Sequence, residues 1–208
     1  MGVISGVKRD LRYVAGLRRL LKRIKPIQLD SDILVADDFE EVVDRHPDNL
    51  AIDDGDRRLS YRELDALANR YAHWATGRGL RRGETVALMM HNRADYLAAW
   101  IGFSKVGVAA ALINTNLDGQ PLAHCLAIAG AANVVTDADC WACVERARPF
   151  VGRPIQTWVL GLGMDDEASD RRGLDSAVKS ASSVRPAKSA RAGLTNRDTA
   201  LFIYTSGT

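Results

Sequence analysis

The feature that most constrains the fold of this chain is an alternation of strand-length apolar runs with segments of helical periodicity. Residues 85–90 (TVALMM) carry no charge, and an uninterrupted run of this length is typical of a strand buried on both faces. Because parallel strands need crossover connections, the alternation predicts an α/β fold, a mostly parallel sheet with flanking helices. The other expected strands are 108–113, 133–136, 157–160 and 199–204, and the helices between them are 94–105, 121–129 and 139–148.

Residues 37–80 show start and stop signals for smaller elements. A short helix is expected over 37–45, and a hairpin is expected over 50–59, where Asp-Gly at 54–55 favours a tight turn. Ser60 and Glu63 have the spacing of a capping box, which predicts that a helix begins there. Residues 161–198 look least ordered, and 179–192 is interpreted as a linker.

Charge is unevenly distributed along the chain. Residues 1–25 contain eight basic side chains and one acidic side chain, a net +7, whereas the remainder of the chain is net acidic at −5. Apolar residues in the same segment recur every three or four positions, and Pro26 ends the pattern. The apolar stripe consists of Val3, Val7, Leu11, Val14, Leu17, Leu21 and Ile24.

This pattern predicts a basic amphipathic helix within residues 1–34, and three interpretations of it stay open. It could bind an anionic membrane surface through residues 1–26, pack on its own domain, or contact nucleic acid. The chain has neither interleaved aromatic residues nor a known reader motif, so nucleic acid is not an expected partner. Three cysteines and the lack of a secretory signature favour a cytoplasmic protein, bound peripherally at the inner face of a membrane if the arm acts as an anchor.

Polar residues follow three of the expected strands, at the edge where open parallel sheets bind ligands. They are His91-Asn92, Asn114-Thr115-Asn116, and the final four residues Thr205, Ser206, Gly207 and Thr208. The last group offers hydroxyl donors and a glycine that frees backbone N–H groups to point at an anion. In isolation the tetrapeptide is weak evidence, because most such sequences are ordinary polar turns.

Cys140 and Cys143 form a Cys-x-x-Cys pair with three open interpretations: structural thiols, a redox dithiol, or half of a zinc site. Zinc would need two more ligands, for which His124 and Cys125 are the nearby candidates. The adjacent His124 and Cys125 could also suggest a thiol nucleophile and its base, but neighbouring helix positions point about 100° apart. The sequence contains no Walker-type phosphate loop, no correctly spaced dinucleotide motif, and no His-Glu-x-x-His.

Four segments together resemble the adenylate-forming superfamily of acyl-CoA synthetases, adenylation domains and luciferases. They are residues 60–65 (SYRELD), 79–88 (GLRRGETVAL), 114–126 (NTNLDGQPLAHCL) and 204–208 (YTSGT). The third is similar to the fatty acid transport protein and very-long-chain acyl-CoA synthetase branch. Glu84 replaces the commoner Asp of the second motif.

The resemblance implies an ATP- and Mg²⁺-dependent ligase that activates a fatty acid carboxylate and transfers the acyl group to coenzyme A. By resemblance, Thr205, Ser206, Gly207 and Thr208 would bind the ATP phosphates, and no catalytic or metal-binding residue can be carried over. Family members continue for several hundred residues. We therefore expect residues 35–208 to be the N-terminal part of an AMP-binding domain that stops within the phosphate loop, and we expect this piece to be inactive and poorly soluble alone. The alternative is a non-catalytic fragment that binds membrane surfaces.

Overall fold

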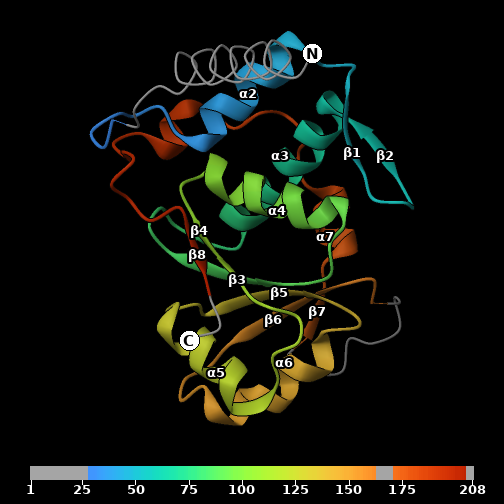
Figure 1. Ribbon diagram of the computed structural model, residues 1–208, viewed down its shortest axis with the longest axis vertical. Helices are drawn as coiled ribbons and strands as arrows, with labels where there is room; N and C mark the ends of the chain where they lie inside the picture. Colours follow the sequence, from blue (N-terminus) through green and yellow to red (C-terminus); the bar gives the residue numbers. More distant parts are fainter. Residues whose placement is uncertain (1–27, 163–170, 205–208) are drawn as a thin grey trace, which may run out of the picture.

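The structure, a computed structural model, describes residues 28–162 and 171–204 and confirms the α/β fold (Figure 1). Its centre is a six-stranded sheet in the order β7-β6-β5-β3-β4-β8, and every neighbouring pair is parallel. The strands are β3 Thr85–Met89, β4 Ala109–Leu112, β5 Asn133–Asp137, β6 Gln156–Leu160, β7 Arg171–Gly173 and β8 Leu201–Ile203. The helices are α2 Val35–Arg45, α3 Tyr61–Gly77, α4 Ala94–Lys105, α5 Gly119–Ile128, α6 Trp141–Ala147 and α7 Asp175–Ser180, with short 3₁₀ turns η1 Arg148–Phe150 and η2 Lys188–Arg191.

Helices cover both faces of the sheet, with α3, α4 and α7 on one side and α5 and α6 on the other (Figure 1). Successive strand residues point to opposite faces, so the apolar run of β3 supplies both cores. Val86 and Leu88 pack into the cluster that contains α3 and α4, whereas Ala87 and Met89 pack into the cluster with α5. All four side chains are fully buried, as the uncharged run predicted.

The sheet reverses its direction of growth at β3. From β3 the chain passes to β4 on one side, and then crosses back to pair β5 with the opposite edge of β3. Such a reversal separates the crossover helices onto opposite faces, and it leaves a crevice beyond the carboxyl ends of the strands. The segments after β3, β4, β5 and β8 therefore converge on one edge.

The predicted hairpin and capping box are both present. β1 Leu50–Asp53 pairs antiparallel with β2 Arg58–Ser60, and Gly55 in the turn has a φ of 89°. The hydroxyl of Ser60 accepts from the backbone N–H of Glu63 at 3.3 Å, while the Glu63 carboxylate accepts from the Ser60 N–H at 2.8 Å. Two backbone N–H groups at the start of α3, which have no carbonyl partner within the helix, thereby gain hydrogen bonds.

The prediction that residues 179–192 form a linker was wrong. This segment contains η2, in which Arg191 is 4% exposed and its guanidinium donates to Glu40 at 2.7 Å and to Asp37 at 2.9 Å. β7 lies before this segment and α7 runs into its first two residues, adding a sixth strand and a helix that were not predicted. Serine- and alanine-rich composition looks like a linker, but long-range ion pairs to α2 dock the segment on the domain.

Candidate functional site

A pocket of about 390 Å³ lies beyond the carboxyl ends of β3, β4 and β8. It brings together two of the three polar groups predicted to share this edge, from residues 91–92 and 114–115, although Asn116 does not line it. Among the described residues, the lining consists of Met90, His91, Asn92, Tyr96, Leu112, Ile113, Asn114, Thr115, Ile203 and Tyr204. Two of the three strand ends that the sequence singled out therefore lie at one pocket in the described part of the chain.

The pocket wall is fixed by local hydrogen bonds. The Tyr204 hydroxyl donates to the backbone carbonyl of Cys125 at 2.9 Å, which ties the end of β8 to α5. The Asn114 side-chain oxygen accepts from the Asn116 N–H at 2.9 Å, an Asx turn that holds the loop after β4. Burial raises the pKa of Tyr204, so its hydroxyl stays protonated at neutral pH.

The described lining carries no lysine or arginine. A triphosphate needs charge-assisted or backbone donors, and this neutral, half-apolar wall alone does not supply them. The four residues predicted to bind phosphate, Thr205 to Thr208, come directly after Tyr204 but lie outside the described residues. The described part of the site therefore fits the floor of a ligand crevice rather than a complete phosphate cradle.

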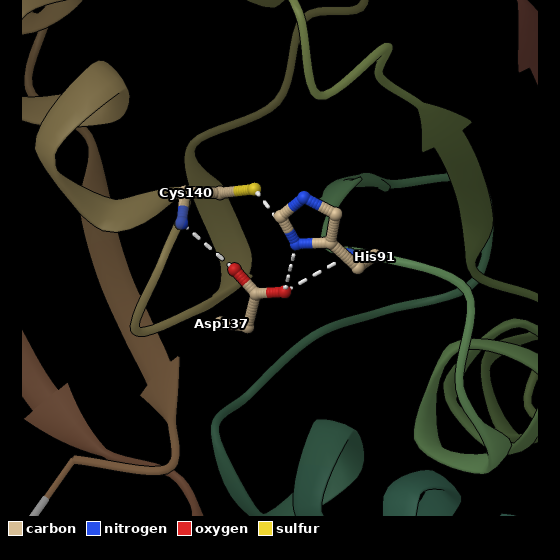
Figure 2. Close-up of side chains that lie close together, drawn as sticks. All are labelled: His91, Asp137 and Cys140. Atoms are coloured by element: carbon tan, nitrogen blue, oxygen red, sulfur yellow. Dashed lines mark hydrogen bonds and ion pairs between the residues drawn. The ribbon is translucent and has the colours of Figure 1, made fainter. Parts of the chain in front are cut away.

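Three side chains at the end of β5 and in the segments that follow β3 and β5 meet beside this pocket (Figure 2). Asp137, the last residue of β5, accepts through one carboxylate oxygen from the His91 N–H at 2.9 Å and from His91 Nδ1 at 3.0 Å. Its other oxygen accepts from the Cys140 N–H at 2.8 Å, at the start of α6. The Cys140 sulfur lies 3.8 Å from His91 Nδ1.

Burial and hydrogen bonding shift the pKa values of Asp137 and Cys140 in this cluster. Burial opposes ionisation of Asp137, but hydrogen bonds from the backbone N–H groups of His91 and Cys140 and from both side chains outweigh it and lower the pKa of Asp137. Burial and the neighbouring Asp137 carboxylate raise the pKa of Cys140 to about 12. Cys140 is thus a neutral thiol at physiological pH in the described structure, which argues against the redox-dithiol interpretation.

The structure does not bring the predicted zinc ligands together. His124 is exposed on α5, and Cys125 is half-buried with a pKa raised by burial. The Cys143 sulfur accepts from Arg146 at 3.3 Å. Within the described residues, the one cluster of potential ligands consists of His91, Asp137 and Cys140 instead. Sequence reasoning missed Asp137, although its place directly after the expected strand 133–136 was a usable signal.

A larger cavity of about 830 Å³ lies between α2 and residues 185–193, away from this edge of the sheet. Charged side chains dominate its lining, and several of them belong to the ion pairs between α2 and η2. Among the residues that the structure describes, no helix has the length and apolarity that a membrane crossing requires. The basic segment 1–26 falls outside the described residues.

Solved structures of similar fold include CoA ligases. The anthranilate CoA ligase AuaEII in complex with anthranoyl-AMP matches with a TM-score of 0.76 at 21% identity, covering 87% of this chain and 33% of that one. The N-terminal domain of FACL13 from Mycobacterium tuberculosis matches with a TM-score of 0.68 at 26% identity, covering 82% of this chain and 40% of that one. The fold is that of the N-terminal part of acyl-CoA ligases.

Sequence comparison specifies the family. The family model of AMP-binding enzymes matches residues 39–208, and the chain belongs to that family. It is 34% identical to long-chain fatty acid transport protein 1 of Bos taurus, over 82% of this chain and 26% of that protein. It is 29% identical to the medium/long-chain-fatty-acid–CoA ligase FadD6 of Mycobacterium tuberculosis, over 82% of this chain and 26% of that protein. The chain thus spans about a quarter of the length of the curated relatives it matches, and the resemblance seen in its motifs is confirmed.

Proposed function

We propose that this chain is the N-terminal part of an ATP-dependent long- or very-long-chain fatty acyl-CoA synthetase. The observation that carries the proposal is the match of residues 39–208 to the AMP-binding family, together with the position of Tyr204 in the pocket at the carboxyl edge of the sheet. Relatives named for long-chain fatty acid transport and for fatty acid–CoA ligation support the substrate class.

In this proposal ATP, bound with Mg²⁺, supplies the adenylyl group that activates a fatty acid carboxylate, and coenzyme A supplies the thiol that accepts the acyl group. The described residues form the wall of the crevice and hold its shape through the Tyr204 bond to α5. Thr205, Ser206, Gly207 and Thr208 contact the ATP phosphates through hydroxyl and backbone donors. Each such bond to a charged group contributes about 1.5–3 kcal/mol.

The test uses the whole protein that contains this chain and measures fatty acid-dependent pyrophosphate release and acyl-CoA formation across a series of chain lengths. We expect Thr205→Ala to lower kcat/KM by roughly 10- to 100-fold, the equivalent of one such hydrogen bond. Thr199→Ala is the matched control, because Thr199 is exposed just before β8, at the end opposite Tyr204. Equal kcat/KM of the two variants would contradict the proposal. Pyrophosphate release that does not depend on added fatty acid would contradict it as well.

Residues 1–208 alone are proposed to be inactive, since the phosphate loop of the family continues beyond Thr208. Pyrophosphate release by the purified 208-residue chain with oleate, ATP and Mg²⁺, at a rate above buffer, would overturn this part of the proposal. It would leave the family assignment unaffected.

A second role is proposed for residues 1–26 because of their net charge and apolar stripe. A basic amphipathic helix adsorbs to anionic lipid, and each basic residue near the surface contributes about 1 kcal/mol. This segment would hold the protein at the cytoplasmic face of a membrane, close to its fatty acid substrate. If the chain acts without the rest of the enzyme, membrane binding is the function that this segment supports.

A further inference from the structure

We propose that His91, Asp137 and Cys140 form a binding site for a zinc-type divalent transition metal. The ligand atoms are His91 Nδ1, a carboxylate oxygen of Asp137 and Cys140 Sγ. Three protein ligands leave a fourth coordination position for water or another small donor. This site is separate from the ATP-bound Mg²⁺ of the proposed reaction.

The geometry of the cluster is close to that of a metal site. The three candidate ligand atoms all lie within 4.8 Å of one another, with His91 Nδ1 3.0 Å from Asp137 and 3.8 Å from the Cys140 sulfur. Bond lengths of about 2.0–2.3 Å to tetrahedral zinc place ligand atoms roughly 3.3–3.8 Å apart. The distance of 3.8 Å between His91 Nδ1 and the Cys140 sulfur falls within this range, and the 3.0 Å between Nδ1 and the Asp137 carboxylate would have to widen by a few tenths of an ångström to admit the ion.

The two buried ligands are held in place by the fold. The side chain of Asp137 is 3% exposed, and backbone N–H groups bind both of its oxygens. Cys140 is 2% exposed at the N-terminal end of α6. Parallel pairing of Met89 with Thr136 brings the segments after β3 and β5 side by side, so the ligands converge from two loops. Preorganisation of this kind reduces the ordering cost of binding.

The third ligand provides access. The His91 side chain is 59% exposed, and Figure 2 shows its ring lying over the carboxylate with Nδ1 directed at Asp137. A metal ion can enter as the ring swings away. On binding, the Cys140 thiol loses its proton to solvent as the sulfur–metal bond forms. The proton of a neutral imidazole shifts from Nδ1 to Nε2.

Ligand chemistry selects the class of ion. A thiolate with an imidazole suits zinc and related transition metals, whereas Mg²⁺ and Ca²⁺ prefer all-oxygen ligands. A millimolar excess of Mg²⁺, as an ATP-dependent enzyme would encounter, should not displace the bound ion. Because His91 also lines the edge pocket, the open coordination position would lie next to that crevice.

The experiment uses Co²⁺ as a spectroscopic probe for zinc in the reduced, untagged 208-residue chain. We expect one Co²⁺ per chain, a near-ultraviolet thiolate-to-cobalt charge-transfer band, and loss of the band when Zn²⁺ but not Mg²⁺ is added. Cys140→Ser should abolish the band. The matched controls Cys143→Ser and Cys125→Ser should retain it with an affinity within about twofold.

His91→Ala keeps the test decisive if the Cys140 variant folds poorly, since the exposed ring can be removed without opening the core. We expect at least a tenfold weaker Co²⁺ affinity, because losing a ligand should cost no less than the roughly 10- to 100-fold loss caused by removing a residue that only orients a ligand. The proposal is overturned if the wild-type chain shows no thiolate band or if Cys140→Ser retains it. It is equally overturned if the band depends on Cys143 or if His91→Ala binds as tightly as the wild type.

Discussion

Lys105 Nζ lies 2.6 Å from the carboxylate of Asp65, and neither side chain is more than 11% exposed. Lys105 also donates to Glu40 at 2.9 Å and is itself fully buried. Through these contacts the end of α4 is joined to both α2 and α3, and Arg191 joins Glu40 to η2. A buried charge network therefore holds the helical layer together on the side of the sheet opposite α5 and α6.

Replacement of Lys105 should be strongly destabilising. Lys105→Met removes the fully buried cation that Glu40 and Asp65 share, and among the described residues it leaves them only Arg191, 2.7 Å from Glu40, and Arg185, 3.6 Å from Asp65. Breaking a buried pair in this way costs about 3–5 kcal/mol. Lys188→Met is the control, because Lys188 pairs with Asp37 at 3.0 Å but its side chain is 77% exposed, so about 1 kcal/mol or less is expected. Urea unfolding of both variants checks this, and similar losses would contradict it.

Stability should fall in acid partly because of Asp37. Burial opposes its ionisation, but hydrogen bonds from Arg191, the Leu34 N–H and Lys188 outweigh burial and lower the pKa of Asp37 from 3.8 to about 2. The folded-state pKa lies below the unfolded value, so this contribution of about 2 kcal/mol is present above pH 4 and is lost as pH falls toward 2. The stability difference between the wild type and Asp37→Asn should therefore shrink from pH 5 to pH 3. A constant difference would refute this assignment.

Close packing of α3 against α4 should make Gly102 hard to replace. A Cβ at Gly102 would lie 2.4 Å from the backbone oxygen of Ala68 and 2.8 Å from the Tyr71 side chain. Gly102→Ala must push the helices apart, at a cost of about 1–3 kcal/mol. Gly77→Ala, at the end of α3, would meet no atom within 4 Å and should be neutral or slightly stabilising. Thermal unfolding of both variants measures the difference in stability. Equal melting temperatures would argue against close contact between α3 and α4.

Cys140 should react slowly with alkylating reagents. With its pKa raised to about 12 from 9.0, its thiolate fraction at pH 8 is lower by roughly a thousandfold. Mass spectrometry of iodoacetamide-treated protein in the presence of EDTA should find the half-exposed Cys143 labelled well before Cys140. Faster labelling of Cys140 would revive the redox interpretation of the Cys-x-x-Cys pair.

Membrane binding should depend on residues 1–26. Deletion of this segment removes its net positive charge and its apolar stripe, so flotation with vesicles containing anionic lipid should be lost, and raised salt should weaken flotation of the intact chain. Neutral vesicles are the control for non-specific adsorption. Unchanged flotation after the deletion would show that the segment is not the anchor.

The main helices and strands were predictable because their signals are local. The limits of α4 at Ala94–Lys105 follow from apolar periodicity, and the start of α3 follows from Ser60 and Glu63. β7 and α7 were missed, since β7 is three residues long and the segment around both is rich in serine, alanine and charge. Docking through Arg191 could not be predicted either, because its partner Glu40 lies 151 residues away.

The sequence by itself determined the α/β class, the family, and the set of strand ends that supply the crevice, since periodicity and motifs are written in consecutive residues. Only the tertiary structure decided the strand order, and with it which strand ends are neighbours. Pairing β5 with β3 brought Asp137 to His91, 46 residues apart, and left His124 and Cys125 elsewhere. The physical reason is that hydrogen-bonded pairing and burial act between segments whose proximity has no local signature.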